Sequence, residues 1–382
     1  MNFRKLGRTG LLVGEIGMGC EGFVDKSDDE IKAFLDVMEE NGVNCIDLYT
    51  SNPQVRKGLA RALKGRREKF ILQSHICSVW ENGQYKRTRK IDEVKKGFEV
   101  MLQELDCDFI DIGMIHYVDS MSDLDGILNG EIIEFVKELK QKGKIGCIGM
   151  SSHNPVVARR AVETGLIDVL MFSVNPCYDM QPADEDVEQL WNPDKYDKPL
   201  LNMDEDRKNL YETCEKLGVG ITVMKAFGGG DLLNSDISPA KIALTPIQCI
   251  HYALTRPAVA TVLCGARHIE ELEGALLYET ASDDEKDYAK TLASFPKISW
   301  EGHCMYCGHC APCPKGIEVH NVTKFLNLAL AQGFVPETVR EHYKSLKHKA
   351  SECIECHSCE KRCPFEVEVV QNMRRAVEIF GE

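Results

Sequence analysis

Short apolar runs alternate with longer amphipathic stretches along most of the chain. Each run is continuously hydrophobic and only a few residues long, which is typical of strands buried on both faces of a parallel sheet. Eight such runs are present: Glu15–Met18, Asn44–Leu48, Phe70–His75, Ile110–His116, Lys144–Ser151, Val169–Phe172, Gly220–Met224 and Val259–Cys264.

An amphipathic stretch follows each apolar run. Asp28–Asn41 begins after Ser27 and ends at Gly42, which are ordinary helix start and stop signals. The others are Gln54–Leu63, Arg89–Leu105, Glu131–Lys140, Pro155–Glu163, Asp204–Leu217, Ser238–Leu254 and His268–Glu279. Eight strand–helix units predict a closed (β/α)8 TIM barrel. An open doubly wound sheet is the alternative, but no Gly-x-Gly-x-x-Gly turn supports it.

One connection is unusually long. Ser173–Met203 contains four prolines and an acidic run around Asp184–Glu188. Long loops in compact domains are commonly functional. We expect a lid over the C-terminal end of the barrel; the alternative is a solvated surface excursion.

Cysteines divide the chain into two parts. Of 17 cysteines, eight lie between Cys304 and Cys363, in the runs C-x2-C-x2-C-x2-C-P and C-x2-C-x2-C-x3-C-P. The second run is the bacterial ferredoxin pattern for a [4Fe–4S] cluster. Zinc is the competing ligand, but two runs of four cysteines, each ending in Cys-Pro, fit a tetrahedral site poorly.

The two runs predict two [4Fe–4S] clusters with crossed ligands. In two-cluster ferredoxins the fourth cysteine of each run serves the other cluster. One set is therefore Cys304, Cys307, Cys310 and Cys363. The other set is Cys353, Cys356, Cys359 and Cys313.

The predicted domains are a barrel with a linking helix at residues 1–297 and a small, mainly helical, ferredoxin-like domain at residues 298–382. The linking helix is expected at Ser282–Phe295. Helices of the second domain are expected at Asn321–Ala331, Pro336–Lys349 and Val367–Phe380.

Composition and charge limit the function. A hydrophobic share of 43%, a charged share of 28% and a net charge of −14 describe a folded acidic protein. Nucleic acid is not an expected partner, because phosphate contacts need a basic face. No apolar run could span a membrane, and the charged N-terminus is unlike a signal peptide. We expect a cytoplasmic protein, whose many cysteines indicate metal or redox chemistry.

Five segments of the barrel carry a family resemblance. These segments are Arg4–Leu11, Gly42–Asp47, Ile110–His116, Lys144–Ser151 and Gly265–Leu272. Through them the first part of the chain resembles the aldo/keto reductase family, one branch of which carries a two-cluster C-terminal domain.

The resemblance implies carbonyl reduction with NADPH by an Asp, a Tyr, a Lys and a His at the C-terminal barrel face. Asp47 and His116 match the Asp and the His. Asn52 stands where the family has its Tyr, and His75 where it has its Lys. The chain therefore departs from the family at the two residues most needed for proton donation.

The resemblance also locates candidate nucleotide contacts. These are Ser151, Ser152, His153, Gly265 and Arg267. Three other cofactor positions have lost their hydrogen-bonding or stacking groups: Met171, Met224 and Ala275. Ordinary dependence on a nicotinamide is therefore not expected.

Substitutes for the missing proton donor can be named. Tyr49 shares a strand face with Asp47, and the alternative is a packed wall tyrosine. His75 and Lys225 end the third and seventh strands, where barrel catalytic residues lie. For His75 a capped surface histidine is the alternative. Lys225 is favoured as functional, because burial of an unpaired lysine is costly.

Three other residues near the strand ends are weaker candidates for the site. His153 is a candidate ligand-binding group or a loop histidine. Cys20 and Cys177 are expected to be core residues rather than cavity groups.

Three functions fit these features. The first is an iron–sulfur oxidoreductase of aldo/keto reductase type. Its barrel binds a small polar organic substrate, and its clusters relay electrons from ferredoxin, a flavin or a partner subunit. The second is an NAD(P)H-dependent carbonyl reductase with a substitute proton donor. The third is a non-catalytic electron-transfer or redox-sensing protein.

Overall fold

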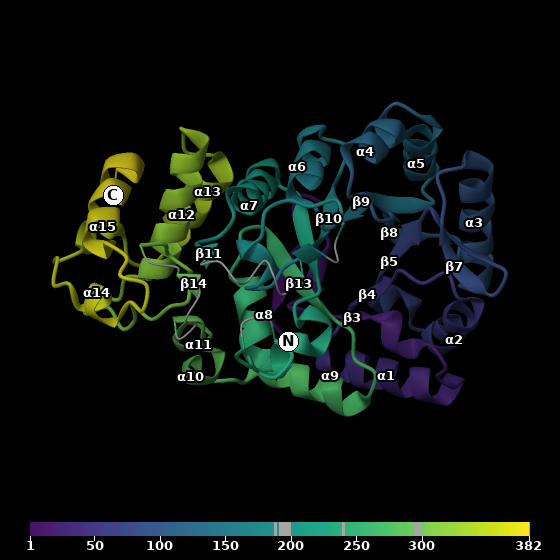
Figure 1. The fold of residues 1–382 in the computed structure, drawn as a ribbon, viewed down its shortest axis with the longest axis horizontal. Helices are drawn as coiled ribbons and strands as arrows, with labels where there is room; N and C mark the ends of the chain where they lie inside the picture. Colours follow the sequence, from purple (N-terminus) through teal and green to yellow (C-terminus); the bar gives the residue numbers. More distant parts are fainter. Residues whose placement is uncertain (187–188, 191–199, 239–240, 294–297, 300–301, 382) are drawn as a thin grey trace.

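Eight parallel strands close into a barrel in the order β10-β12-β13-β3-β4-β5-β8-β9 (Figure 1). The computed structural model describes the chain except residues 187–188, 191–199, 239–240, 294–297, 300–301 and 382. Every predicted apolar run is a barrel strand: β3 (Ile16–Gly19), β4 (Cys45–Leu48), β5 (Ile71–Ile76), β8 (Ile110–Ile115), β9 (Ile145–Ser152), β10 (Val169–Ser173), β12 (Gly220–Met224) and β13 (Val259–Cys264). The barrel prediction is confirmed, and the open sheet is excluded.

Helices surround the barrel, as the amphipathic stretches predicted. They are α1 (Asp28–Asn41), α2 (Pro53–Leu63), α3 (Ile91–Glu104), α5 (Glu131–Gln141), α6 (Pro155–Glu163), α7 (Glu205–Leu217), α8 (Pro246–Leu254) and α9 (Ile269–Leu276). The prediction for α8 started too early, at Ser238. Thr245 and Gln248 form a capping box there, and Pro246 occupies the first turn. A further helix, α4 (Met121–Leu128), was not predicted.

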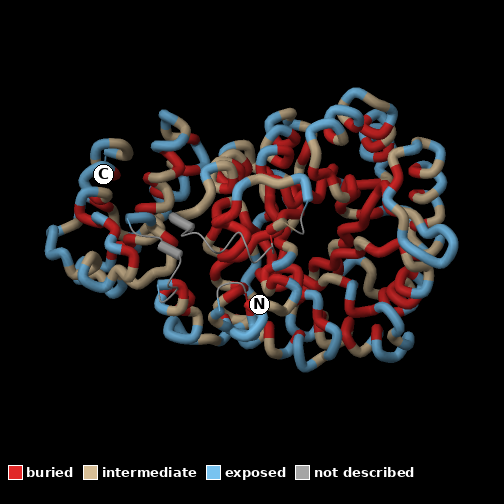
Figure 2. Tube along the Cα trace, viewed as in Figure 1, coloured by how far each residue is buried: buried red, intermediate tan, exposed pale blue. Residues whose placement is uncertain are grey.

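The buried apolar residues form two clusters, a small one inside the barrel and a large one that packs the helices on the strands and extends into the cysteine domain. Figure 2 shows that the barrel strands are buried along most of their length. The inner core contains strand residues such as Cys45, Ile112 and Met171, since alternate residues of a strand face the barrel axis. Leu6 and Val13 join it from the short hairpin of β1 (Phe3–Lys5) and β2 (Leu12–Gly14). That hairpin packs near Gly218 and Gly220, and therefore closes the N-terminal end.

A second hairpin follows the third barrel strand. Its strands are β6 (Ser78–Glu81) and β7 (Gln84–Arg87), with Trp80 paired to Tyr85. The connecting residues Asn82 and Gly83 have φ angles of 53° and 78°. Positive φ at both positions is the type I′ turn that Asn-Gly favours. The hairpin was not predicted, although this dipeptide signals it.

The long connection after β10 starts inside the protein. Residues 174–181 are buried, and Asp179 is fully enclosed. Its carboxylate accepts hydrogen bonds from Tyr211 and Tyr252 and lies 3.6 Å from the Arg207 guanidinium. Neither a lid nor a solvated excursion describes this part, because a buried ion pair fixes it. Residues 187–188 and 191–199 of the predicted lid lie outside the described residues.

The linking helix is broken into α10 (Asp283–Lys286) and α11 (Ala289–Ala293). Asp287 causes the break, since its carboxylate accepts from the backbone N–H groups of Ala289 and Lys290 and caps α11. Strand β14 (Ile298–Ser299) then pairs with β11 (Leu200–Leu201). The predicted helices of the second domain are present as α12 (Val319–Gln332), α13 (Glu337–Ser345) and α15 (Val369–Phe380), and α14 (Ser358–Arg362) lies among the cysteines.

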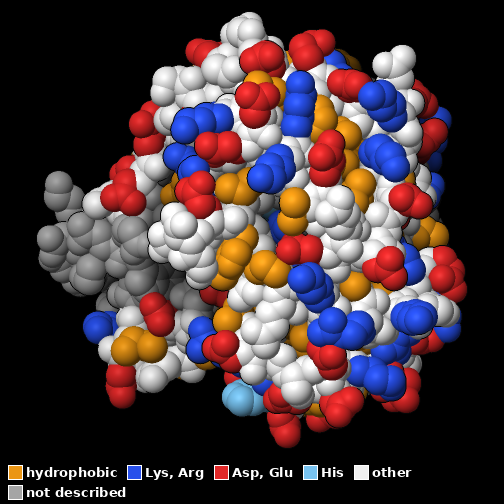
Figure 3. Space-filling view, turned by 90° about the vertical axis from the view of Figure 1, so that its right-hand side faces the viewer, with side chains coloured by type: hydrophobic (Ala, Val, Ile, Leu, Met, Phe, Trp, Pro, Cys, Tyr) orange, Lys and Arg blue, Asp and Glu red, His pale blue; other side chains and the backbone are white. Residues whose placement is uncertain are grey.

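Six short 3-10 helices complete the described secondary structure. They are η1 (Cys20–Phe23), η2 (Arg67–Lys69), η3 (Tyr178–Met180), η6 (Gly228–Leu233), η7 (Leu277–Glu279) and η8 (Ala350–Glu352). Within the described part of the chain, no helix is both long enough and apolar enough to cross a membrane. Figure 3 shows the helical face at the right of Figure 1, where acidic and basic side chains are interspersed.

Helix α7 carries a buried acid. Glu212 is 5% exposed, and burial raises the pKa of its carboxyl group to about 7. The unfolded chain ionises this group near 4.5. Since the folded protein holds the proton more tightly, its ionisation costs stability as pH rises from about 4.5 to about 7.

We predict that Glu212→Gln raises the free energy of unfolding by about 1–3 kcal/mol at pH 8 and has no effect below pH 4.5. Urea denaturation followed by circular dichroism at both pH values measures this. Glu205→Gln, on the same helix with a side chain 73% exposed, is the control and should have little effect at either pH. An equal gain at both pH values would contradict the interpretation.

Candidate functional site

Asp47, His75 and His116 meet at the C-terminal end of the barrel. They end three neighbouring strands, β4, β5 and β8, and all three side chains are buried. His75 Nε2 lies 3.0 Å from Asp47 Oδ1, and His75 Nδ1 lies 2.6 Å from His116 Nδ1. The sequence predicted these residues individually; their hydrogen-bonded chain is a result of the structure.

The donor and acceptor roles in this chain follow from Asp47. An ionised carboxylate only accepts, so in the arrangement with Asp47 ionised His75 Nε2–H donates to it, and His75 Nδ1 accepts on the other side. His116 Nδ1–H then donates to His75. Burial lowers the pKa of His116 well below its usual value, and His75 and Arg89 lower it further. His116 is therefore neutral at pH 7, with Nε2 free to accept.

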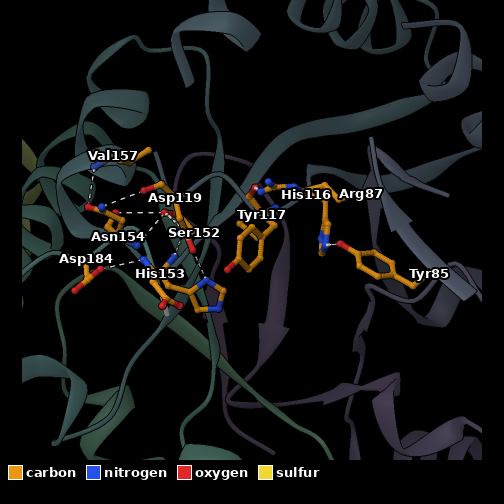
Figure 4. A network of polar contacts seen from close by, with 12 residues as sticks. Tyr85, Arg87, His116, Tyr117, Asp119, Ser152, His153, Asn154, Val157 and Asp184 are labelled. Carbon is orange, nitrogen blue, oxygen red and sulfur yellow. Dashed lines mark hydrogen bonds and ion pairs between the residues drawn. The ribbon is translucent and has the colours of Figure 1, made fainter. Parts of the chain in front are cut away.

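A tyrosine that sequence reasoning missed completes the chain. The Tyr85 hydroxyl lies 2.6 Å from His116 Nε2, and its ring meets the imidazole edge-on at a centroid distance of 5.5 Å (Figure 4). Tyr85 comes from strand β7. Tyr49, the predicted substitute, also flanks His116, with nearly parallel rings 6.4 Å apart. No hydrogen bond of the Tyr49 hydroxyl is found among the described residues, and burial raises its pKa to about 12.

Two neutral side chains support Asp47 from inside the barrel. Gln73 Nε2 donates to Asp47 Oδ1 at 2.7 Å, and Thr222 Oγ1 donates to Gln73 Oε1 at 3.0 Å. Gln73 precedes His75 by two residues and shares its strand face. The carboxylate therefore has partners from both the barrel interior and the barrel mouth.

A second polar network surrounds Asp119, next to the first (Figure 4). The carboxylate accepts from His153 Nδ1 at 2.8 Å, from the His153 backbone N–H at 2.6 Å and from Ser152 Oγ at 2.9 Å. Burial alone would raise the pKa of Asp119, but the hydrogen bonds of His153 and Ser152 lower it overall. Tyr117 packs on His153, with ring centroids 5.2 Å apart, so His153 is held in place in the loop between β9 and α6.

The candidate nucleotide contacts do not form a binding site in the described structure. Ser152 donates inward to Asp119, and Ser151 Oγ accepts from the Tyr117 backbone N–H at 2.8 Å. Gly265 and Arg267 lie exposed after β13. With both serine hydroxyls engaged inside the protein, the residues present do not fit a nicotinamide dinucleotide.

Two further candidates lie apart from the hydrogen-bonded chain. Asn52 is the N-cap of α2 and accepts from the Gln54 backbone N–H. Lys225 is exposed, so the burial argument that favoured a function for it does not hold. Cys20 and Cys177 are fully buried, as expected of core residues.

The cysteines of the second domain gather in the two crossed sets. One cavity is lined by Cys313 together with Cys353, Cys356 and Cys359. In the other group, the thiol of Cys304 lies close enough to three thiols for charge on them to raise its pKa, in addition to the larger effect of burial. Those three belong to Cys307, Cys310 and Cys363.

The surroundings of these thiols suit cluster ligands. Burial opposes ionisation of Cys307, while the backbone N–H of His309 faces its sulfur and favours the charged form. The Glu355 backbone N–H similarly lies 3.4 Å from Cys353 Sγ. Arg362 holds the two runs together by donating to the carbonyls of Cys310 and Pro312. Among the described residues, no three His, Cys, Asp or Glu side chains lie close enough together to hold a single metal ion.

The barrel touches the cysteine domain through a buried arginine. Arg256, 1% exposed, donates to the Met305 carbonyl at 2.7 Å, and the Tyr288 hydroxyl donates to the same oxygen at 2.5 Å. The guanidinium also lies over the rings of Tyr252 and Tyr306, 4.5 and 5.6 Å from their centroids. Since Met305 follows Cys304, the first cysteine set lies directly against the barrel.

An eight-stranded barrel with Asp and His at its C-terminal face, joined to a cysteine-rich helical domain, defines a two-domain redox enzyme. The aldo/keto reductase family model matches residues 15–243, and the chain belongs to this family. The 4Fe–4S dicluster domain model matches residues 303–368. The chain is therefore an oxidoreductase with an iron–sulfur domain.

Known relatives cover mainly the barrel. The uncharacterized oxidoreductase YqkF of Bacillus subtilis (strain 168) is 26% identical over 314 residues, covering 78% of this chain and 97% of the relative. A probable aldo-keto reductase 1 of Glycine max is 25% identical over 243 residues, 59% of each chain. Among solved structures, AKR11C1 of Bacillus halodurans in its holo form has a TM-score of 0.58 at 22% identity, covering 75% of this chain and 94% of that one. That likeness shows the fold alone.

We predict that Asp119→Asn destabilises the protein by about 1–3 kcal/mol, because an amide accepts fewer of the hydrogen bonds now made to the carboxylate. Urea denaturation measures the loss. Asp125→Asn, exposed on the neighbouring helix α4, is the control and should change the midpoint little. An unchanged midpoint for Asp119→Asn would show that this network does not hold the barrel mouth.

Proposed function

We propose that this chain is an iron–sulfur oxidoreductase in which two [4Fe–4S] clusters relay single electrons to a small polar organic substrate. The substrate would bind at the C-terminal end of the barrel, beside Asp47, His75 and His116. The observation that carries the proposal is the contact of Arg256 with Met305, which joins the barrel to the first cysteine set. That contact fixes the cysteine domain against the barrel.

The proposed ligand sets are those of the crossed pattern. Cys304, Cys307, Cys310 and Cys363 hold the cluster nearer the barrel. Cys353, Cys356, Cys359 and Cys313 hold the outer one. The lining of the described cavity supports the second set, and the closeness of Cys304 to its three partners supports the first. When bound, each cluster supplies one-electron chemistry.

Exposure suggests the order in which electrons pass. Cys356 is exposed and Ile354, two residues earlier, is 56% exposed, whereas Met305 beside Cys304 is buried. We assign the outer cluster to a protein electron donor, such as a reduced ferredoxin, and the inner one to the barrel. Such clusters can pass electrons in either direction. With reduced ferredoxin as the donor, the proposed reaction is reduction of the substrate.

Two candidate functions compete with this one. A nicotinamide-dependent carbonyl reductase is disfavoured by the inward hydrogen bonds of Ser151 and Ser152. A non-catalytic electron-transfer protein would have no need for the buried chain Asp47–His75–His116. We propose a cytoplasmic enzyme without nucleic-acid or membrane partners, consistent with its net charge of −14.

Protein purified without oxygen should contain about eight iron and eight sulfide atoms per chain if two clusters are present. Cys356→Ser should lower the iron content toward half, because one ligand of the outer cluster is lost. Cys107→Ser, a partly exposed barrel cysteine, is the control and should leave the content unchanged. Stoichiometric zinc with little iron in the unmodified protein would contradict the cluster assignment.

The electron source can be tested on the same protein. We expect reduced ferredoxin to bleach the visible cluster absorbance, and neither NADH nor NADPH to do so without a mediator. The reason is that the nucleotide-contact residues are turned inward or dispersed. Rapid bleaching by either nucleotide would favour the carbonyl reductase alternative.

A further inference from the structure

The Tyr85 hydroxyl ends a continuous hydrogen-bonded chain that begins at a buried carboxylate. We propose that Tyr85 is the catalytic proton donor of this site, and that His116 and His75 connect it to Asp47 as a proton relay. This inference rests on the proposed function for its substrate, a small organic carbonyl compound. The proton path itself rests on the hydrogen-bond distances between Tyr85, His116, His75 and Asp47.

Every link of the relay has hydrogen-bonding geometry. The distances are 2.6 Å from Tyr85 Oη to His116 Nε2, 2.6 Å between the two Nδ1 atoms and 3.0 Å from His75 Nε2 to Asp47 Oδ1. Each imidazole uses both of its ring nitrogens in these hydrogen bonds, so the chain is unbranched. A neutral imidazole can accept a proton on one nitrogen and release one from the other.

The relay has two complete arrangements that differ by one proton. With Asp47 ionised, each hydrogen bond points from Tyr85 toward the carboxylate. With Asp47 protonated, each can point the other way: Asp47 donates to His75, His75 to His116, and His116 Nε2–H to the tyrosine oxygen. The Tyr85 O–H is then released from His116 and can donate to a ligand at the barrel mouth.

The chemical step balances in protons and electrons. Reduction of a carbonyl to an alcohol takes two electrons and two protons. The electrons come one at a time from the reduced ferredoxin, and one proton reaches carbon from solvent. The other passes from Tyr85 to the carbonyl oxygen, forming the alcohol O–H bond. The phenolate oxygen takes a proton from His116, His116 from His75, and His75 from Asp47, which ends ionised.

Tyr85 is better placed than the other tyrosine for this role. Its side chain is 39% exposed while its hydroxyl contacts a buried histidine, so it connects solvent-accessible space with the interior. Tyr49 stacks beside the same histidine without a hydrogen bond from its hydroxyl among the described residues. The turn at Asn82 and Gly83 fixes the hairpin that carries Tyr85.

The first test reads the relay without any substrate. In the full chain, purified without oxygen and labelled with 15N-histidine, NMR should show His75 and His116 as single fixed tautomers. His116 should carry its proton on Nδ1 and His75 on Nε2. Tyr85→Phe removes only the hydroxyl and should shift the His116 Nε2 signal, while Tyr49→Phe should not. An unshifted His116 signal in Tyr85→Phe would overturn the relay.

The second test reads proton donation. With benzaldehyde as the carbonyl probe and reduced ferredoxin as the donor, Tyr85→Phe should lower kcat by about 10²-fold or more, the usual effect of losing a general acid. Lys86→Gln, at a partly exposed residue of the same hairpin strand that pairs with Glu81 and Glu93 away from the relay, should stay close to the unmodified protein. A loss in Tyr49→Phe with none in Tyr85→Phe would overturn the proposal.

The two tests also separate this inference from the proposed function. If the unmodified protein accepts electrons from ferredoxin but reduces no carbonyl probe, the proposed function fails as stated. The histidine spectra then decide the relay alone, since a His116 Nε2 signal that shifts in Tyr85→Phe supports it and an unshifted signal overturns it.

Discussion

The structure of the barrel mouth depends on one buried carboxylate. Asp47 is 2% exposed, and an isolated charge at such depth would cost several kcal/mol. Gln73 stabilises it from below, and His75 from the neighbouring strand, through direct hydrogen bonds. The remaining polar atom of each of these buried partners also needs a hydrogen bond. Thr222 therefore meets Gln73, and His116 meets His75. The need to compensate one charge thus organises four strands.

The same constraint explains the replacement at the third strand. A lysine at position 75 would compensate Asp47 by its own positive charge and end the network there. A histidine compensates it by a hydrogen bond and presents a second nitrogen on its other side. That nitrogen extends the chain to His116 and then to Tyr85. With histidine at position 75, a hydrogen-bonded chain stands where a lysine would form an ion pair. The hydroxyl group at the end of this chain belongs to Tyr85 on the hairpin, whereas the strand-end position holds Asn52.

The sequence was sufficient for the features that depend on local periodicity. All eight barrel strands, and the helices between them except α4, followed from hydrophobic patterning, because burial on both faces of a strand requires continuous apolar residues. Asp47 and His116 were identified through the family resemblance. The cysteine spacing also predicted an iron–sulfur domain, because four thiols around one cubane need short fixed intervals, and the 4Fe–4S dicluster model matches there.

Features that depend on long-range contacts could not be predicted in the same way. Asp119 and His153 belong to different strand–helix units, and only the closed barrel brings them together. The buried start of the long connection depends on Arg207, which pairs with Asp179. Read in sequence alone, a charged residue such as Arg207 suggests a solvent-exposed segment. Tyr85 was different, since Asn82–Gly83 marks a hairpin and the strand register alone would have placed Tyr85 opposite Trp80.

In the proposed function, electrons and protons approach the site from different sides of the barrel. Figure 1 shows the cysteine domain on one side and the β7 hairpin on the other. Arg256 and Tyr288 fasten the cysteine domain near β13 through rigid, buried contacts. The relay instead runs along β4, β5 and β8 and reaches a half-exposed tyrosine. Spatial separation of this kind is physically useful, because an electron crosses packed protein by tunnelling whereas a proton needs a continuous series of donors and acceptors. A barrel accommodates both, since its strands converge on one end while each strand brings its groups from a different direction.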